Sequence, residues 1–194
     1  MLQRILLIFF VLTVAIVGGA GSVAYMLKAP EGIGAMTIGG WTAYPDIGTA
    51  DADPYSKARV AREGVLSLGR AEGLAFVADR DSTGGKLRRD CDYLVQGVTP
   101  PARFWTLFAA DAQLGALDTA EPQPPAVQSR MIVRQPDNSF VVALGAHPVS
   151  GNWIPIRGAG PMTLLLTLYY TPIGGSTAME EIDLPKIVRM TCDG

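Results

Sequence analysis

Hydrophobic residues dominate the first part of the chain, and residues 5–27 contain no charged side chain. A helix of about 20 apolar residues is long enough to cross the hydrocarbon core of a bilayer, which is roughly 30 Å thick. Arg4 precedes the run and Lys28 ends it. The pattern therefore predicts a transmembrane helix at residues 1–28, with the lipid bilayer as the partner of residues 5–27.

Two interpretations of this segment are open, because an uncleaved signal-anchor and a cleaved signal peptide both begin with a basic residue and an apolar stretch. The small residues at 18–22 are typical of a cleavage region. The apolar run continues past them to Leu27, whereas the apolar centre of a signal peptide usually has only about 7–15 residues. We therefore favour the anchor, and Arg4 on its short side favours an N-terminus that stays inside.

Three glycines, Gly18, Gly19 and Gly21, would form a smooth face on this helix. Small residues let transmembrane helices approach closely and pack through van der Waals contacts. We expect this face to pack against another membrane helix, so other membrane proteins are candidate partners.

Residues 29–52 are rich in Gly, Pro and isolated aromatic residues, which predicts a linker with a first short strand near residues 35–38. A helix should follow, because Asp53 suits the N-cap and Pro54 suits the first helical position. We expect this helix to run to about Leu68 and to bury one stripe of side chains at helical spacing. The stripe consists of Tyr55, Ala58, Ala61, Val65 and Leu68.

After residue 73 the pattern changes to short apolar segments separated by turn residues, with a turn expected at 81–85 and a loop at 147–160. Residues 135–139 are turn-like and lie between two apolar segments, which predicts a β-hairpin. Residues 162–170 are apolar at nearly every position, so we place them in the centre of a sheet. The expected strands are residues 74–78, 91–96, 103–109, 129–133, 140–144, 162–170 and 186–190.

Strands that follow one another without intervening helices are typical of antiparallel architectures. We therefore expect a mainly β fold: an antiparallel β-sandwich of jelly-roll type over residues 53–194, with one amphipathic helix packed near its start. The 22 glycines and 14 prolines agree with many turns. A net charge of −2, with charges scattered along the chain, gives no electrostatic case for binding nucleic acid.

Several motifs follow one another in this part of the chain: PPxxFW at residues 100–105, NWIP at 152–155 and GPxxLxLxLY at 160–169. Together with the segment GLAFVADRD that precedes them, they resemble the bacterial domain-of-unknown-function family 1214, in its short form with an N-terminal membrane segment. The resemblance implies a β-sandwich of jelly-roll type and carries over no reaction. It also implies longer relatives, in which this domain is joined to a second domain of unknown function.

An anchor with its N-terminus inside would place residues 53–194 in the periplasm, on the outer side of a bacterial inner membrane. That compartment is oxidising, so the two cysteines, Cys91 and Cys192, are expected to form a disulfide. The first opens an expected strand and the second follows the last one, so the bridge would tie the C-terminus to the sheet. Two unpaired buried thiols are the alternative. Two cysteines and one histidine lack the spacing of metal ligands, and we expect no metal site.

The residues give no positive case for an enzyme, because no G-x-S-x-G, H-E-x-x-H or P-loop motif is present. His147, the only histidine, precedes Pro148 in an expected loop. Asp79 and Asp81 flank Arg80 and precede two glycines. Paired carboxylates could bind Ca²⁺, but the remaining ligands are missing, and a turn is the better interpretation. We therefore predict no catalytic residue and no cofactor.

Aromatic residues provide the sharpest candidate for a binding site. Phe104, Trp105 and Phe108 share one expected strand, so at least one of them should face out of the core. The alternative is that Trp105 and Trp153 fill the core while Asn152 hydrogen-bonds the loop backbone. The residues that could line a groove for a small hydrophobic ligand or a glycan are Trp41, Tyr44, Arg103, Trp105, Asn152 and Trp153.

Two functional hypotheses follow. The first is an accessory or scaffold subunit of an envelope complex, anchored in the inner membrane and bound to other membrane or periplasmic proteins. The second is a periplasmic module that binds a small ligand in the aromatic groove. A hydrolase is a third hypothesis, which would need His147 or a pair of carboxylates to converge in a pocket.

Overall fold

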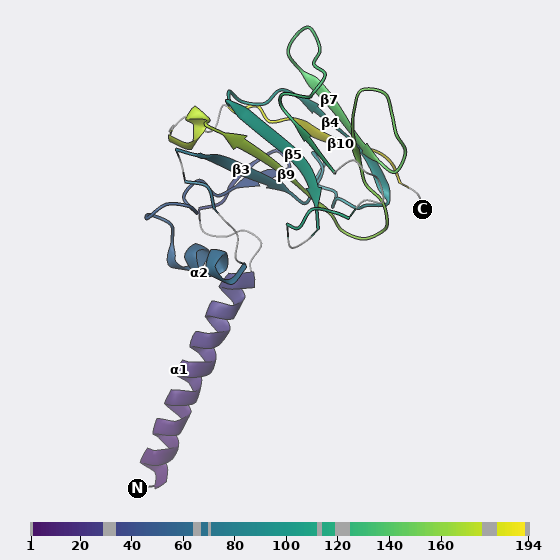
Figure 1. Cartoon of the computed structure of the whole chain (residues 1–194). Helices are drawn as coiled ribbons and strands as arrows, with labels where there is room; N and C mark the ends of the chain where they lie inside the picture. The colour runs from purple at the N-terminus through teal and green to yellow at the C-terminus, as the bar shows by residue number, and fades with distance from the viewer. Residues whose placement is uncertain are drawn as a thin grey trace.

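The computed structural model describes residues 2–28, 34–63, 67–69, 71–111, 114–118, 125–175 and 182–192. Helix α1 (Leu2–Lys28) projects away from the β-rich part of the chain, and helix α2 (Pro54–Glu63) lies beside its C-terminal end (Figure 1). Within the described residues, Leu2–Tyr25 is the one helical segment that is long and apolar enough to cross a membrane, and none of it is buried. The predicted N-terminal apolar helix is therefore confirmed.

The rest of the chain is mainly β and forms two sheets. Among the described residues every strand pair is antiparallel except one, β7 with β8, which is parallel and departs from the expected all-antiparallel arrangement. The six-stranded sheet has the order β1 (Met36–Ile38), β2 (Trp41–Ala43), β3 (Gly73–Ala78), β9 (Thr163–Tyr169), β5 (Phe104–Ala110) and β6 (Ala126–Gln128). The four-stranded sheet has the order β10 (Lys186–Cys192), β4 (Cys91–Gly97), β7 (Phe140–Gly145) and β8 (Asn152–Pro155).

Alternating residues of both sheets contribute to one hydrophobic core. Along β5, for example, Trp105 and Leu107 are buried while Phe104 and Phe108 are half-buried on the other face, as the period of a strand requires. Strand β9 lies between β3 and β5, so the prediction of a central strand at 162–170 is confirmed. Jelly-roll connectivity stays a prediction.

Helix α2 begins where the sequence indicates. The Asp53 carboxylate accepts hydrogen bonds from the backbone N–H groups of Tyr55 and Ser56 at 2.9 and 3.1 Å, which is an N-cap. The helix ends at Glu63, and residues 67–69 are not helical, so the expected end at Leu68 is wrong.

The buried side of α2 also differs from the prediction. Ser56 is buried and Val60 is half-buried, whereas Tyr55, Ala58 and Ala61 of the expected stripe are exposed. The helix packs on the rest of the fold through buried Ala52, which precedes it, and through Ser56 and Val60, which follow four and eight residues later. Val65 lies outside the described residues.

Two further expectations are corrected. Residues 129–133 form turns rather than a hairpin strand, because the segment before them, β6, pairs with β5 in the other sheet. Only a single bridge, between Arg134 and Phe140, closes the turn at 135–139. The expected loop at 147–160 contains strand β8, which adds to the edge of β7. In both cases local patterning along the chain does not specify which strand edge the segment meets.

The remaining element is a short 3-10 helix, η1 (Pro172–Gly175), directly after β9. Ile173 within it is buried in the common core. Residues 121–125 contain three prolines, which predicts a surface loop because proline cannot donate to a strand ladder, and they lie mostly outside the described residues.

Candidate functional site

The turn that follows β3 holds a buried carboxylate. Asp81 is only 2% exposed, and its Oδ1 accepts hydrogen bonds from the backbone N–H groups of Thr83 and Gly85 and from the Thr83 hydroxyl, at 2.6 to 2.9 Å. The turn itself closes through the Gly84 N–H, which donates to the Asp81 carbonyl. A turn at 81–85 is therefore confirmed, and its Asp81 side chain is buried and holds the turn together through hydrogen bonds.

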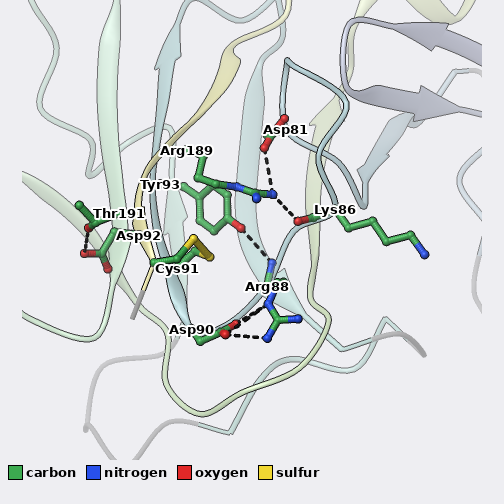
Figure 2. Close-up of a disulfide and its surroundings, with 10 residues drawn as sticks. Asp81, Lys86, Arg88, Asp90, Cys91, Asp92, Tyr93, Arg189 and Thr191 are labelled. Atoms are coloured by element: carbon green, nitrogen blue, oxygen red, sulfur yellow. Dashed lines mark hydrogen bonds and ion pairs between the residues drawn. A yellow bond between two sulfur atoms is a disulfide. The ribbon is translucent and has the colours of Figure 1, made fainter. Parts of the chain in front are cut away.

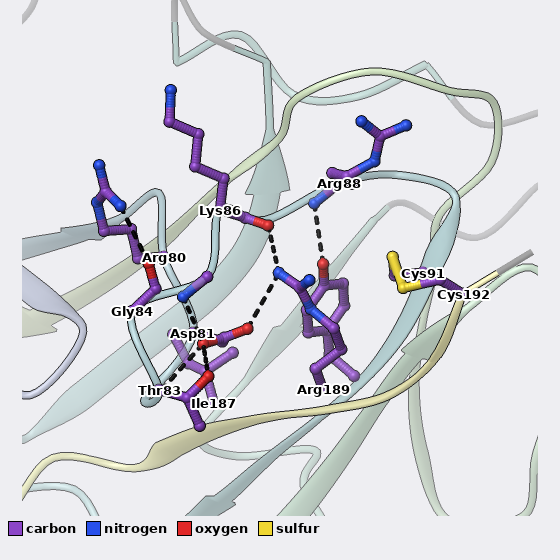
Figure 3. Close-up of polar contacts among 12 residues, drawn as sticks. Arg80, Asp81, Thr83, Gly84, Lys86, Arg88, Cys91, Ile187, Arg189 and Cys192 are labelled. Carbon is purple, nitrogen blue, oxygen red and sulfur yellow. Dashed lines mark hydrogen bonds and ion pairs between the residues drawn. A yellow bond between two sulfur atoms is a disulfide. The ribbon is translucent and has the colours of Figure 1, made fainter. Parts of the chain in front are cut away.

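Arg189 of β10 provides the counter-charge. Its guanidinium lies 3.0 Å from Asp81 Oδ2 and donates to the carbonyl of Lys86 (Figure 3). It also lies over the ring of Tyr93 on the neighbouring strand β4 (Figure 2). Ser82, next to Asp81, exchanges hydrogen bonds with Ile187 of β10 through its backbone N–H and its hydroxyl. The turn thus covers the outer edge of β10 and fastens the six-stranded sheet to the four-stranded one.

The environment of Asp81 favours its ionised form. Burial by itself raises the pKa of this carboxyl, but the hydrogen bonds from Thr83 and Gly85 and the charge of Arg189 outweigh burial and hold the pKa below its usual value. The carboxylate is therefore charged at neutral pH and fully engaged by its neighbours.

A disulfide joins Cys91, the first residue of β4, to Cys192, the last residue of β10. The prediction of this bridge is confirmed. The pairing of the two strands shifts between Arg189 and Cys192, which is a β-bulge, and it places the two cysteines opposite each other (Figure 2). The bridge and the Asp81–Arg189 pair therefore fasten β10 at two points along its length.

Charged residues flank the disulfide on both sides. Arg88 and Asp90 form a two-pronged pair, with the closest N–O distance at 2.6 Å, and the Arg88 backbone N–H donates to the Tyr93 hydroxyl (Figure 2). The hydrogen bond from Arg88 lowers the pKa of Asp90 and raises the pKa of Arg88. Thr191 donates to the carboxylate of Asp92 at 3.2 Å.

Beside these residues lies an open hollow of about 230 Å³. Two guanidinium groups and two carboxylates contribute to its wall, so it suits a polar ligand better than an apolar one. Its lining consists of Arg89, Asp90, Asp92, Ala146, Arg157, Gly158 and Thr191. The disulfide end of the four-stranded sheet is therefore a candidate site for a polar ligand.

The structure places two of the three candidate tryptophans, Trp41 and Trp105, in the core. Trp41 and Trp105 are each 2% exposed. The Trp41 indole N–H donates to the carbonyl of Pro185 at 2.7 Å, and the Trp105 ring packs against Phe140 with ring centres 5.0 Å apart. A ligand groove lined by these two indoles does not fit this packing, because apolar burial of both rings stabilises the fold instead.

The other four candidates are dispersed. The Asn152 side chain hydrogen-bonds the backbone. Its oxygen accepts from the Val133 N–H, and its nitrogen donates to the carbonyls of Val133 and Val141. Trp153 is half-buried, and its indole N–H donates to the Gly145 carbonyl. Arg103 is exposed and lies over the ring of Tyr170. Tyr44 lies near the start of α2, in the wall of a second and much smaller hollow.

Gly18, Gly19 and Gly21 lie in α1, and a Cβ atom added at any of them would meet no neighbouring atom within 4 Å. Nothing in the described chain therefore covers this face, and its role in packing against other helices stays a prediction. His147 is exposed just beyond β7. Among the described residues no three His, Cys, Asp or Glu side chains gather in a group that could hold a metal ion.

The family assignment rests on the segment that contains most of this architecture. A model described as "Protein of unknown function (DUF1214)" matches residues 72–173, just over half of the chain. The chain belongs to this family. The part matched to the DUF1214 model includes Asp81 and Cys91 but ends before Arg189 and Cys192. The Asp81–Arg189 ion pair and the disulfide therefore both join the matched segment to a strand beyond it, β10.

Two solved structures are similar to this DUF1214 protein. The VPA0106 protein of Vibrio parahaemolyticus is 19% identical, with a TM-score of 0.56, over 73% of this chain and 36% of its own. A putative uncharacterized protein from Burkholderia cenocepacia is 17% identical, with a TM-score of 0.42, over 94% of this chain and 52% of its own. The chain therefore spans between about a third and about half of these neighbours, and the first likeness shows a shared fold. No curated protein matches the sequence.

Sequence reasoning misses the charged residues of the site. It places Asp81 in a turn and gives no reason to select Arg189, Arg89 or Arg157, because a charge that pairs across two sheets leaves no local pattern. One signal is present in the sequence: Asp-Ser-Thr-Gly-Gly is typical of a turn in which the Asp side chain bonds the backbone.

Proposed function

We propose that this protein is an accessory or scaffold subunit of a bacterial envelope complex, tethered to the inner membrane by α1 as an uncleaved signal-anchor, with its β-rich part in the periplasm. The observation that carries the proposal is α1 itself. Its large apolar side chains from Leu2 to Val17 are all more than half exposed, and nothing else in the described chain packs on them. In water such a surface is strongly unfavourable, whereas in lipid it is satisfied.

The disulfide supports the compartment. A bridge between Cys91 and Cys192 persists in an oxidising environment such as the periplasm and is rare in the cytosol. Together, an apolar N-terminal helix and a bridged β-rich part are what a single-pass protein facing the periplasm needs.

The accessory role follows from what the site offers. The buried carboxylate of Asp81 and the guanidinium of Arg189 pair to fasten β10, and the motifs of common enzyme classes are absent from the sequence.

The test follows the intact chain in cells. We expect it to stay with the membrane after alkaline carbonate washing, and to bring partner proteins with it when purified in mild detergent after crosslinking. The variant Leu12→Arg places a charge in the middle of α1 and should release the protein from the membrane, whereas Met131→Arg, at a 78% exposed residue of the β-rich part, should not. A chain that washes off freely would contradict the anchor, and a solitary monomer without crosslinks would contradict the scaffold.

A second candidate function is supported by the hollow at the disulfide end. Its two guanidinium groups and two carboxylates could hold a glycan, whose hydroxyl groups both donate and accept hydrogen bonds. Binding of neutral and acidic oligosaccharides, measured by calorimetry, should be weakened by Arg89→Ala and Arg157→Ala and unaffected by Arg130→Ala, which lies outside the hollow. If no oligosaccharide binds, or if all three variants behave alike, this candidate fails.

A further inference from the structure

Helix α2 presents a face that no other part of the described chain covers. Its buried side is narrow and consists of Ser56 with Val60 half-buried beside it. At 3.6 residues per turn, Ala58 and Ala61 lie at the centre of the opposite side. Lys57 flanks them on one side, and Tyr55 and Arg62 flank them on the other. These five residues, all exposed, are the outer face of α2.

The position of this helix is unusual for an exposed element of a β-rich fold. It contacts α1 and lies beside the C-terminal end of that helix, on the side toward which α1 extends (Figure 1). Tyr25 near that end of α1 is 75% exposed, and tyrosines are enriched where transmembrane helices leave the hydrocarbon region. If α1 spans the bilayer, α2 is therefore carried to the level of the lipid headgroups.

The chemistry of the outer face suits that location. Small apolar residues lie in its middle, and an amphipathic tyrosine and two basic side chains lie at its borders. Lysine and arginine on such a helix can extend toward anionic headgroups while their aliphatic stems stay on the apolar side. The Lys57 ammonium donates to the Ala50 carbonyl at 2.8 Å, which leaves two of its three donors for other groups.

We propose that the outer face of α2 lies on the anionic surface of the bilayer and fixes the orientation of the β-rich part relative to the membrane. This inference rests on the proposed function, because it requires α1 to be inserted. A ten-residue helix has too little area to hold a protein on a membrane alone. Here α1 supplies the tether, so contact of α2 with the surface is intramolecular and needs only a weak local affinity.

The test uses the full-length chain reconstituted in vesicles of phosphatidylcholine with phosphatidylglycerol. The native cysteines are joined in a disulfide, so one introduced cysteine can be labelled with an environment-sensitive dye without reductant. Three positions are compared: Ala58→Cys on α2, Ile16→Cys within α1, and Gln135→Cys in the exposed turn before β7. That turn lies at the far end of the β-rich part from α1 (Figure 1). Quenchers attached to the lipid headgroup and to the acyl chain report the depth of each label.

We expect the label at position 16 to be quenched from the acyl chain, the label at 58 from the headgroup, and the label at 135 by neither. Adding Lys57→Gln and Arg62→Gln should lower the headgroup quenching at 58 by about twofold or more, and so should high salt or vesicles of phosphatidylcholine alone. The matched control Lys186→Gln, at an exposed residue of β10, should leave it unchanged.

The outcomes separate the two proposals. If the label at 16 is quenched while the label at 58 stays as accessible to water as the label at 135, the membrane anchor stands and the inference about α2 is wrong. The same holds if quenching at 58 is indifferent to the charge variants and to the lipid charge. If the label at 16 is not quenched, both the anchor and the docking of α2 are overturned.

Discussion

The carboxylate of Asp81 and the guanidinium of Arg189 lie 3.0 Å apart and join the turn after β3 to the edge strand β10. The carboxylate is almost fully buried, while the arginine side chain is about one-third exposed. Their contact connects two sheets that share no strand, so we expect the pair to influence global stability rather than one local turn.

Removing the carboxylate should destabilise the fold strongly. Asp81→Ala takes away the acceptor of three hydrogen bonds and leaves Arg189 without its buried counter-charge. We expect a loss of about 2–4 kcal/mol in the free energy of unfolding, measured by urea denaturation. Asp79→Ala, two residues away at an exposed carboxylate, should change it by less than about 0.5 kcal/mol. Equal effects of the two variants would show that the Asp81–Arg189 pair is not a stabilising element.

The same carboxylate predicts how stability depends on pH. Because the pKa of Asp81 is lower in the folded protein than in the unfolded chain, its contribution is complete above the unfolded pKa of about 4 and is lost as pH falls through the folded pKa. Stability measured by urea denaturation should therefore fall below about pH 4. Asp81→Asn should be less stable at neutral pH and should show a shallower acid dependence. Parallel pH profiles for the two proteins would contradict this assignment.

The disulfide should be a major source of stability. It joins residues 101 positions apart, and the chain-entropy model gives up to about 4–5 kcal/mol for a loop of this length. We expect the double variant Cys91→Ser, Cys192→Ser to lower the free energy of unfolding, measured by urea denaturation, by up to this amount. Reductant should have the same effect on the unmodified protein. Mass spectrometry of the denatured, unreduced protein should show no alkylated thiol. Two alkylated thiols in that sample would contradict the bridge.

Trp105 should behave as a core residue. Trp105→Ala removes a large buried ring that packs on Phe140, and such truncations cost about 3–5 kcal/mol. Val149→Ala, at a half-exposed residue, should cost less than about 0.5 kcal/mol. Thermal or urea unfolding compares the two. A fold that tolerates Trp105→Ala as well as Val149→Ala would reopen the case for a ligand-binding role of this indole.

The glycine face of α1 predicts partner association within the membrane. Replacing Gly18, Gly19 and Gly21 with leucine meets no atom of the described chain, so the β-rich part should keep its unfolding midpoint. Bulkier side chains would keep a neighbouring helix from close approach, so co-purification of partners in mild detergent should fall. Val23→Leu, also in α1, serves as the control. Unchanged retention would mean that α1 is only a tether.

Several features could be predicted because their cause is local. A charge-free run longer than the bilayer is thick needs no tertiary information, and neither does the Asp53–Pro54 start of α2. Strand β9 could be placed in the centre of a sheet because leucines on both of its faces would otherwise meet water. The disulfide followed from the expected compartment and from the position of each cysteine at a strand end.

Other features were out of reach because they depend on which segments meet. The stripe of Tyr55, Ala58 and Ala61 has helical spacing, yet the fold offers a packing surface only to Ser56 and Val60. The sequence does not show whether Trp41 and Trp105 line a groove or fill the core, because their burial depends on how the sheets pack.

The amino-acid sequence by itself thus determined the membrane-type helix and the predominance of strands, since these follow from hydrophobic run length and period, and it predicted the cysteine pairing from an expected oxidising compartment. Only the tertiary structure decided that β7 and β8 run parallel, that Asp81 meets Arg189, and that charged side chains surround the hollow beside the disulfide. Such contacts depend on how separate segments come together in space, and no local propensity encodes which partner a strand edge or a buried charge will find.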